Sequence, residues 1–415
     1  MDIAIVLKIV RDVFRVDKPE YARADVLTLA HDNDRSFLHG GKWYSPLIDT
    51  IEDDLRARGA RCLSVARIIS RIKGDLAYGD VVSPEGAFAR ALVVKRLMGR
   101  LRPAGYPYSG MEEAIWGDIL DRSGVRKVLG IQPSRELCVA CHKRGIWVAD
   151  VQHGVIGESH PWYGLQFRGD EPAHYLPSAF LLWDKGSQAV IDRWGVAKGI
   201  ATIVTGNRWV ARFQHPRPDD TLVGPLLAQY AQRGLNPEGK PVVLVALSWG
   251  EVNIPNGFMV DDLVTVIHAS ARDYFWCVRL HPNQLNGFAT HEGRRFKRFF
   301  QDKLQGYVEW EVATRSPLPL MLLHADLLIS WNSSTAIEAS QMGVRSALMD
   351  PRLRGDGVLR NYYEYHRSLG MIDTIDASRP VIEQWLAANV EKKAVPEAYR
   401  EFDRAYDDLL GFLVA

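Results

Sequence analysis

The sequence has little cysteine, almost no net charge and no long apolar run, and each shortage excludes a class of protein. Its 415 residues include only four cysteines, which favours a reducing compartment. The close pair, Cys138 and Cys141, lies in an apolar helical pattern, so we expect core packing rather than zinc or redox chemistry. The 51 basic and 50 acidic residues predict no nucleic-acid partner. No apolar run reaches the length of about 18 residues that a membrane span requires.

Two glycine-rich phosphate-binding patterns are missing as well. No Gly-x-Gly-x-x-Gly fingerprint follows the first strand of either half of the chain, and no Gly-x-x-x-x-Gly-Lys-Ser/Thr loop occurs anywhere. The first pattern is typical of dehydrogenases and the second of P-loop kinases. Both classes are therefore disfavoured.

Short apolar runs alternate with helical patterns along most of the chain. A first series of predicted strands lies at 25–30, 61–65, 126–131, 146–152, 179–183 and 201–205. A second series lies at 242–247, 274–280, 307–311, 326–331 and 346–349. Alternation of this kind favours parallel sheets covered by helices. The predicted fold class is α/β, with two Rossmann-like doubly wound domains that face each other across a cleft.

A proline-bearing stretch at 207–240 separates the two series and is interpreted as a linker with one helix near 225–233. We therefore predict an N-terminal domain over 1–220 and a C-terminal domain over 221–395. The apolar residues of 396–415 recur at helical spacing, so this segment is predicted to be an amphipathic helix that packs back toward the N-terminal domain. The polar, glycine-containing stretch at 36–44 is interpreted as a loop.

Polar side chains gather where the predicted strands end. These loops lie at 31–35, 132–134, 153–158, 248–253, 281–283 and 332–335. Doubly wound sheets bind ligands outside the carboxyl ends of their strands. We therefore expect the functional site among these loops.

The loop Asn332, Ser333, Ser334 and Thr335 joins a predicted strand to a helix. Backbone N–H groups at such a helix start attract anions, most often phosphate. Glu338 follows one turn later and is predicted to reach a ribose hydroxyl, although a solvated helix face is an equally open interpretation.

A His-Pro pair, His281 and Pro282, directly follows a predicted strand. The proline fixes the turn, and the histidine can donate a hydrogen bond to a leaving phosphate. By itself such a pair is also common in structural turns. Ser248, in the loop after the first strand of the second half, completes the predicted donor-binding residues.

The motifs that carry a family resemblance are Gln152-His153-Gly154, Arg279-Leu-His-Pro282 and Ser333-Ser-Thr335 with Glu338. With the two predicted domains, they resemble the GT-B glycosyltransferases of bacterial capsule and lipopolysaccharide biosynthesis, particularly those that use CMP-Kdo or CMP-sialic acid. The resemblance extends over about residues 125–350. It implies that His281, Ser333 and Ser334 hold the CMP phosphate and that the N-terminal domain binds the acceptor.

The resemblance also implies a catalytic carboxylate on the N-terminal side of the cleft. Glu158 is the first choice, with His153 to orient it or to contact the donor. Asp32 and Asp34 are the second choice. Acids at strand ends also serve as helix caps and loop anchors, so these roles remain hypotheses.

Three further residues are predicted as acceptor-binding or secondary contacts. Ser134 also suits the N-cap of the helix that follows it. Arg208 and Arg279 would pair with a sugar carboxylate or a phosphate, or else form structural ion pairs.

No metal and no cofactor other than the nucleotide-sugar donor are expected. Asp32-Asn-Asp34 has the Asp-x-Asp form with which GT-A transferases hold a divalent metal, but that motif belongs to a one-domain fold. We therefore predict a metal-independent enzyme.

The expected function is transfer of Kdo or a related acidic sugar from a CMP donor to a bacterial surface glycan, free or lipid-linked. Four alternatives stay open: a polyol-phosphate transferase of the CDP-glycerol type, a transferase that uses a UDP or GDP sugar, a sugar-nucleotide 2-epimerase, and a non-catalytic nucleotide-sugar-binding subunit. The N-terminus carries charges within its apolar part, unlike a secretory signal, and 1–14 is predicted to be an amphipathic helix. A cytoplasmic location is expected, with peripheral membrane association or membership of a polysaccharide assembly complex as open alternatives.

Overall fold

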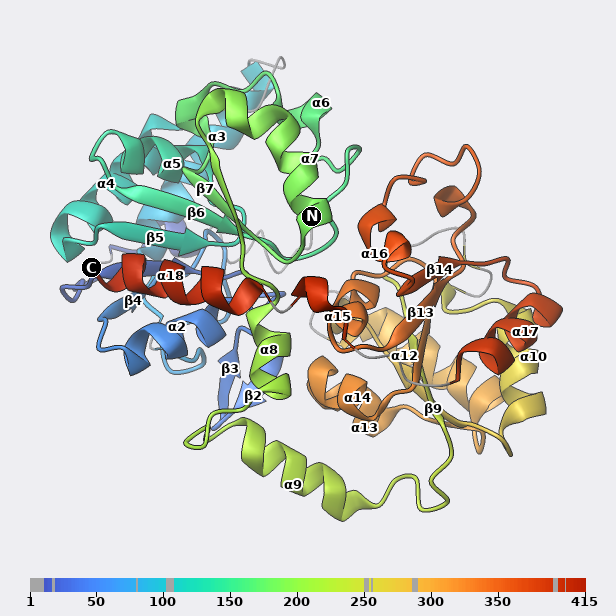
Figure 1. Ribbon diagram of the computed structural model, residues 1–415. Helices are drawn as coiled ribbons and strands as arrows, with labels where there is room; N and C mark the ends of the chain where they lie inside the picture. The colour runs from blue at the N-terminus through green and yellow to red at the C-terminus, as the bar shows by residue number, and fades with distance from the viewer. Residues whose placement is uncertain are drawn as a thin grey trace.

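A computed structural model of the chain describes most of its residues (Figure 1). The described residues are 11–16, 19–79, 81–101, 108–249, 254, 257–285, 290–390, 395–399 and 401–415. Within them the chain forms two parallel sheets of six strands each, which lie in two lobes with helices packed against them. The predicted α/β class with two Rossmann-like domains is confirmed.

The N-terminal sheet has the strand order β4-β1-β5-β6-β7-β8. Its strands are β1 (Val26–Leu29), β4 (Cys62–Ser64), β5 (Lys127–Gly130), β6 (Trp147–Val151), β7 (Ala179–Leu182) and β8 (Ala201–Val204). The first crossover carries the chain from β1 to β4 on one side, and the next carries it to β5 on the other. The loops after β1 and β5 therefore diverge and leave a crevice between them.

The C-terminal sheet has the order β11-β10-β9-β12-β13-β14 and repeats this arrangement. Its strands are β9 (Val242–Ala246), β10 (Phe275–Arg279), β11 (Val308–Glu309), β12 (Leu327–Ser330), β13 (Arg345–Leu348) and β14 (Ile372–Thr374). The strand order reverses between β9 and β12, which pair in parallel. A second crevice is thus expected beside the loops that follow these two strands.

Helices cover both faces of each sheet, as the near-continuous apolar runs of the strands require. On the N-terminal sheet one face is covered by α3 (Glu85–Leu101), α4 (Gly110–Ser123) and α5 (Arg135–His142), and the other by α2 (Ile48–Ala57) and α18 (Phe402–Val414). On the C-terminal sheet α10 (Asp261–Ser270), α12 (Thr290–Phe299) and α17 (Arg379–Asn389) cover one face, and α8 (Arg208–Gln214), α14 (Leu318–His324) and α15 (Thr335–Gln341) the other. The remaining α-helices are α6 (Leu165–Arg168), α7 (Lys185–Gly195), α9 (Val223–Arg233), α11 (Pro282–Leu285), α13 (Glu311–Arg315) and α16 (Glu364–Ser368).

The last helix, α18, lies across the N-terminal lobe, far along the chain from the strands that it covers (Figure 1). Leu409, Leu410 and Leu413 belong to a buried cluster that also includes Val26 and Leu129 of the N-terminal sheet. The domain limits near residues 220 and 395 stay a prediction, but this cluster shows what attracts the end of the chain: an apolar sheet face that α2 alone leaves partly uncovered.

Of two sequence interpretations of connecting segments, one was wrong and the other was incomplete. The predicted loop at 36–44 is a β-hairpin of β2 (Phe37–His39) and β3 (Lys42–Tyr44), whose turn is formed by Gly40 and Gly41 at φ values of 56° and 79°. Two successive residues with positive φ are what a two-residue hairpin turn requires, and glycine supplies them without strain. The predicted linker at 207–240 does contain a helix near 225–233, which is α9, but it also contains α8, which was not predicted.

The predicted N-terminal helix over 1–14 lies mostly outside the described residues. Within the described ranges, no helix is long and apolar enough to cross a membrane.

Truncation of Leu410 to alanine tests the docking of α18. Leu410 is 2% exposed, so Leu410→Ala should lower the free energy of unfolding by about 2–5 kcal/mol through lost burial and a residual cavity. Asp408, exposed on the same helix, provides the matched control Asp408→Ala, for which we expect a change of about 0.5 kcal/mol or less. Denaturant unfolding measures both, and an equal effect of the two variants would contradict this packing.

Candidate functional site

A cavity of about 410 Å³ lies between the two lobes, at the carboxyl ends of both sheets. We call it the cleft. The N-terminal half and α8 contribute His31, Asn33, Asp34, Ser36, Phe37, Pro46, Leu47, Ile131, Gln132, His153, Trp183 and Trp209. The C-terminal half contributes Arg279, His281, Pro282, Thr314, Arg315, Ser316, Pro317, Leu318, Ser333, Ser334, Thr335 and Glu338. The cleft thus joins the two strand-order reversals, and its volume suits a ligand of nucleotide size.

The hydroxyl cluster after β12 faces the cleft as predicted. Ser333, Ser334 and Thr335 all line it. Ser333 Oγ accepts a hydrogen bond from the Thr335 N–H at 3.3 Å, whereas the buried Thr335 hydroxyl has no partner among the described residues. The side chain of Ser334 does not cap α15. Two of these hydroxyls therefore remain for a ligand.

Asn332 and Ser248, predicted to bind the donor, support this turn instead. The Asn332 side-chain amide donates to Asp350 at 3.1 Å and accepts from the Tyr363 hydroxyl at 3.0 Å. The Asn332 N–H donates to Ser248 Oγ at 3.3 Å. Neither residue lines the cleft. Their polar atoms are occupied within the protein, so the structure gives them a positioning role.

His281 lies at the start of α11 and lines the cleft beside Pro282. Its backbone N–H donates to Gln284 Oε1 at 2.8 Å, and its ring lies nearly parallel to the Trp249 ring with centroids 6.2 Å apart. Burial, with a further contribution from the Arg279 charge, lowers the pKa of His281 to about 4. The imidazole is therefore neutral at pH 7 and carries one N–H donor.

Arg279 and Glu338, both half-buried, bring opposite charges to the lining of the cleft. The Arg279 guanidinium donates to the Ser316 carbonyl at 2.6 Å and to the Ala313 carbonyl. Burial lowers the pKa of Arg279 to about 10, and the Glu338 charge opposes this shift. Burial likewise raises the pKa of Glu338 to about 7, against the effect of Arg279 and of a hydrogen bond from Asn207 at 3.1 Å.

The acids of the first strand loop point in different directions. Asp34 lines the cleft and accepts a hydrogen bond from Ser45 Oγ. Burial raises the pKa of Asp34 to about 6, although this hydrogen bond and the Arg35 charge oppose the rise. Asp32 faces away from the cleft and accepts from the Arg71 N–H at 2.6 Å and from the Ser70 hydroxyl. Among the predicted acids of the N-terminal half, Asp34 therefore has the required position.

Glu158, the first choice from the sequence, lies elsewhere. It forms an ion pair with Arg193 and lines a separate cavity of about 240 Å³ beside the start of α7. His153 does line the cleft, with its Nδ1 at 2.8 Å from the Tyr163 hydroxyl, and burial lowers its pKa to about 4. The loop between them turns out of the cleft, so His153 and Glu158 do not act on one ligand atom.

Two predicted secondary contacts are also structural. Ser134 caps α5 by accepting from the Leu137 N–H at 3.2 Å. Arg208 donates to Asp403 at 2.7 Å and lies over the Tyr406 ring of α18 at 4.0 Å. Both match the structural alternatives that the sequence left open.

Several residues that line the cleft were not singled out from the sequence, among them His31, Gln132, Trp183, Trp209 and Arg315. His31 and Gln132 stand in loops that were already expected to bind ligands. The signal that would have singled them out is the strand order, because they follow the two strands between which the order reverses.

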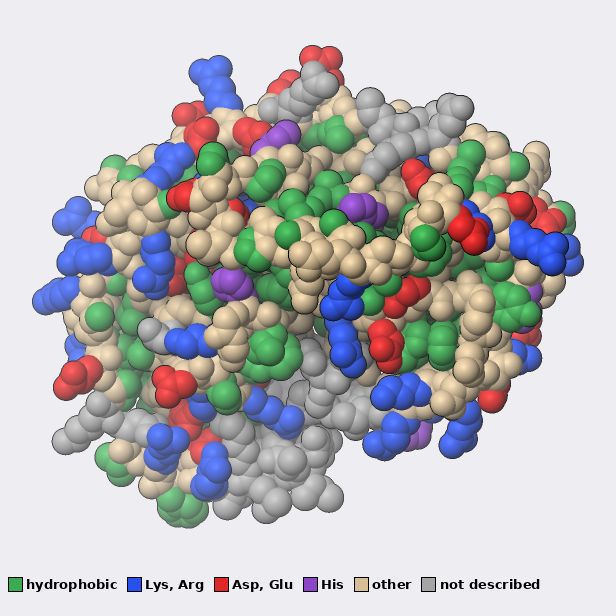
Figure 2. Space-filling view, turned by 90° about the horizontal axis from the view of Figure 1, so that it is seen from below, with side chains coloured by type: hydrophobic (Ala, Val, Ile, Leu, Met, Phe, Trp, Pro, Cys, Tyr) green, Lys and Arg blue, Asp and Glu red, His purple; other side chains and the backbone are tan. Residues whose placement is uncertain are grey.

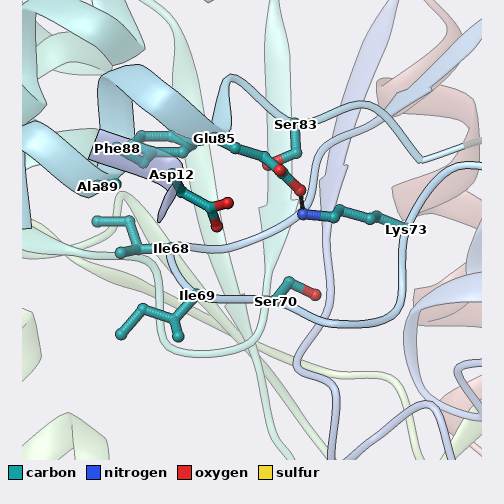
Figure 3. A pocket seen from close by; sticks show the side chains of 9 residues that line it. All are labelled: Asp12, Ile68, Ile69, Ser70, Lys73, Ser83, Glu85, Phe88 and Ala89. Carbon is teal, nitrogen blue, oxygen red and sulfur yellow. Dashed lines mark ion pairs between the residues drawn. The ribbon is translucent and has the colours of Figure 1, made fainter. Parts of the chain in front are cut away.

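Other parts of the described surface offer weaker sites. A cavity of about 10 Å³ beside the Lys73–Glu85 ion pair has room for about one water molecule (Figure 3). On the face shown in Figure 2, Lys and Arg are interspersed with Asp, Glu and hydrophobic side chains. No group of three or more His, Cys, Asp or Glu among the described residues is placed to hold a metal ion.

Comparison with known proteins shows the fold. No protein-family model matches the chain, and no curated protein matches it by sequence. Among solved structures, the chain is similar to the UDP-GlcNAc 2-epimerase from Methanocaldococcus jannaschii, with a TM-score of 0.54, 11% identity, and coverage of 92% of this chain and 98% of that one. It is also similar to the Neisseria meningitidis UDP-GlcNAc 2-epimerase bound to UDP-GlcNAc, with a TM-score of 0.54, 13% identity, and coverage of 94% of this chain and 99% of that one. The wall teichoic acid polymerase TagF matches with a TM-score of 0.54, 11% identity, and coverage of 99% of this chain and 94% of that one.

Together with the cleft between two doubly wound domains, these matches define the class: the chain has the GT-B fold. Identities of 11–13% carry the argument no further than the fold. The finer resemblance to CMP-Kdo transferases is not shown by them.

Replacement of Asn332 separates support of the turn from ligand binding. Asn332→Ala removes the partner of Asp350 and of the Tyr363 hydroxyl, so it should lower the free energy of unfolding by about 1–3 kcal/mol. Ser334→Ala in the same loop removes a hydroxyl that caps no helix and should change it by about 0.5 kcal/mol or less. Thermal or denaturant unfolding without ligand distinguishes them, and the reverse order would refute the positioning role of Asn332.

Proposed function

We propose that the protein is a transferase that binds a nucleotide-activated donor in the cleft and moves the activated group to a hydroxyl of a surface-glycan acceptor. The observation that carries this proposal is the convergence of His281 and the 333–335 hydroxyls from one domain with Asp34 from the other on a single cavity. The groups proposed to hold the donor phosphate therefore line the same cavity as a carboxylate that can act as a base. The structural similarity to an epimerase bound to UDP-GlcNAc and to a teichoic acid polymerase supports a nucleotide-activated ligand.

In the proposed reaction Asp34 accepts the proton of the acceptor hydroxyl. The acceptor oxygen forms a bond to the activated atom, and the bond between that atom and the nucleotide phosphate breaks. Its electron pair remains on the phosphate. Neutral His281 donates its N–H to this phosphate, and Arg279 and the 333–335 hydroxyls surround the developing negative charge. No metal or further cofactor is part of the proposal.

Our finer proposal for the donor is a CMP-linked acidic sugar, such as Kdo. The exposed Arg315 lines the cleft together with the half-buried Arg279 and would pair with the carboxylate of such a sugar. The acceptor would be a free or lipid-linked glycan, met in the cytoplasm or at the inner face of the membrane.

A polyol-phosphate transferase is the second candidate. The match to TagF covers 99% of this chain, against 92% and 94% for the two epimerases, and another TagF structure was soaked with CDPG. A product that gains phosphorus would favour this candidate over sugar transfer.

Nucleotide binding and the role of His281 can be tested together. Calorimetry with CMP, CDP, UDP and GDP should detect binding of at least one nucleotide, and no binding of any would refute the proposal. His281→Ala should lower turnover of the matching donor by about 10²–10³-fold, because the leaving phosphate loses a donor. His174, an exposed histidine outside the cleft, gives the control His174→Ala, which should retain wild-type turnover.

The pH dependence of transfer tests Asp34. A general base works only when ionised, and the pKa of Asp34 is raised to about 6, so kcat/KM should fall about tenfold per pH unit below about pH 6. Asp34→Asn should lower turnover by about 10²–10⁴-fold and abolish this acid limb. Asp32→Asn, on the same loop but outside the cleft, should keep the limb near pH 6. An unchanged profile in Asp34→Asn would remove Asp34 from the reaction.

A further inference from the structure

Gln132 has an unusual backbone conformation directly at the cleft. Its φ is 49°, and Ile69 and Tyr363 are the other non-glycine residues with positive φ among those described. Side chains other than glycine, asparagine and aspartate rarely adopt this region, and they keep it only where the surroundings impose it. Gln132 follows β5, at the reversal of strand order in the N-terminal sheet, and its side chain lines the cleft.

A buried carboxylate on the neighbouring strand imposes this turn. Asp150 of β6 is fully buried, and its Oδ1 accepts from the Gln132 backbone N–H at 2.8 Å. Its other oxygen accepts from Trp162 Nε1 at 3.0 Å, and the Arg168 guanidinium lies 4.4 Å from the centroid of the same indole. Both oxygens of this buried carboxylate accept a hydrogen bond. Loss of either donor would leave a buried oxygen without a partner, so the carboxylate holds both donors in place.

A second set of contacts holds the residues around this turn. The Arg67 guanidinium contacts His31 Nε2 and donates to the Ile131 carbonyl at 2.6 Å. A guanidinium can only donate, so Nε2 must accept and the His31 proton lies on Nδ1. The Gln132 side-chain amide lines the cleft together with His31, so its oxygen and its NH₂ group can both meet a ligand there.

We propose that Gln132 binds the acceptor: its side-chain NH₂ donates a hydrogen bond to an oxygen of the acceptor alcohol, and Asp150 acts as the positioning residue that presents it. This inference rests on the proposed function and extends it to the acceptor side. Asp34 follows β1 and Gln132 follows the adjacent strand β5, so both line the cleft from the N-terminal domain, whereas the groups assigned to the donor phosphate come from the C-terminal domain. Asp34 then receives the proton of a hydroxyl whose position Gln132 defines.

The acceptor class follows from this geometry. An amide that donates and a carboxylate that accepts, both lining one cavity, match an uncharged hydroxyl compound, which presents oxygen lone pairs to the amide and a proton to the carboxylate. An acceptor that carried its own carboxylate at this point would face Asp34 with like charge. We therefore assign a neutral polyol or sugar hydroxyl to this subsite.

The test uses the full chain, with water in the place of the acceptor. Calorimetry first identifies which of CMP, CDP, UDP and GDP binds, and slow hydrolysis of the corresponding donor then reports the acceptor side. Gln132→Glu and Gln132→Gly should keep the nucleotide Kd within about twofold and lower the hydrolysis rate about tenfold, since neither variant can donate from this position. Gly is unstrained at this φ, so Gln132→Gly should melt at or above the wild-type temperature. Ile69→Gly, the same backbone change outside the cleft, should leave hydrolysis unchanged.

A double-mutant cycle tests the role of Asp150. If Asp150 acts through Gln132, Asp150→Asn lowers hydrolysis in the parent but not further in Gln132→Gly. An additive loss would assign Asp150 a purely structural role. Wild-type hydrolysis in both Gln132 variants, with nucleotide binding intact, would overturn the inference alone. A wild-type protein that binds no nucleotide or hydrolyses no donor would overturn the proposed function with it.

Discussion

The structure depends on one geometric constraint, the reversal of strand order in each of two parallel sheets. In the N-terminal sheet, β4 is added on one side of β1 and the later strands on the other. In the C-terminal sheet, β10 and β11 are added on one side of β9 and the later strands on the other. Backbone loops separate at these points and cannot fill the space between them. Because the carboxyl ends of the two sheets meet, the two gaps merge into a single cleft. Asp34, Gln132 and the 333–335 hydroxyls follow strands at these reversals, and Arg279 and His281 come from the end of β10, which pairs with β9.

Burial within this cleft shifts the pKa of each ionisable group toward the value that favours its uncharged form. The pKa values of Asp34 and Glu338 rise, and those of His281, His153 and Arg279 fall. In each case desolvation favours the uncharged form. A donor phosphate would thus enter a site whose histidines are neutral hydrogen-bond donors and whose carboxylates are poised near pH 7. Such an arrangement suits proton transfer to Asp34 better than strong ground-state binding of an anion.

Support residues make up much of the remaining polar chemistry. Asn332 and Ser248 hold the turn after β12, and Asp150 holds the turn after β5. In each case a side chain from a neighbouring strand or loop satisfies backbone or amide groups that would otherwise be unpaired at the bottom of a cleft. A polar residue at a strand end is therefore as commonly a support as a ligand contact. That ambiguity explains why sequence interpretation assigned Asn332 to the donor.

The sequence by itself determined the α/β class, the two sheets and the sheet edge at which function is expected. These follow from local properties: apolar runs of strand length, helical periodicity, and the polar residues that follow each strand. It also placed His281 and the 333–335 hydroxyls, because each lies directly after a strand whose end must face the cleft. The hairpin at 37–44 was not predicted, because its strands are short and its Gly-Gly turn resembles a loop.

Only the tertiary structure decided which acid faces the cleft. Asp32 and Asp34 are two residues apart, and Glu158 shares a loop with His153, so sequence distance cannot rank them. The choice depends on contacts with distant residues: Ser70 and Arg71 turn Asp32 away, and Arg193 holds Glu158 outside. The turn at Gln132 likewise depends on Asp150 and Arg67, which no local pattern connects to it. Local periodicity fixes where strands end, but side-chain direction at those ends is set by packing between segments far apart in the chain.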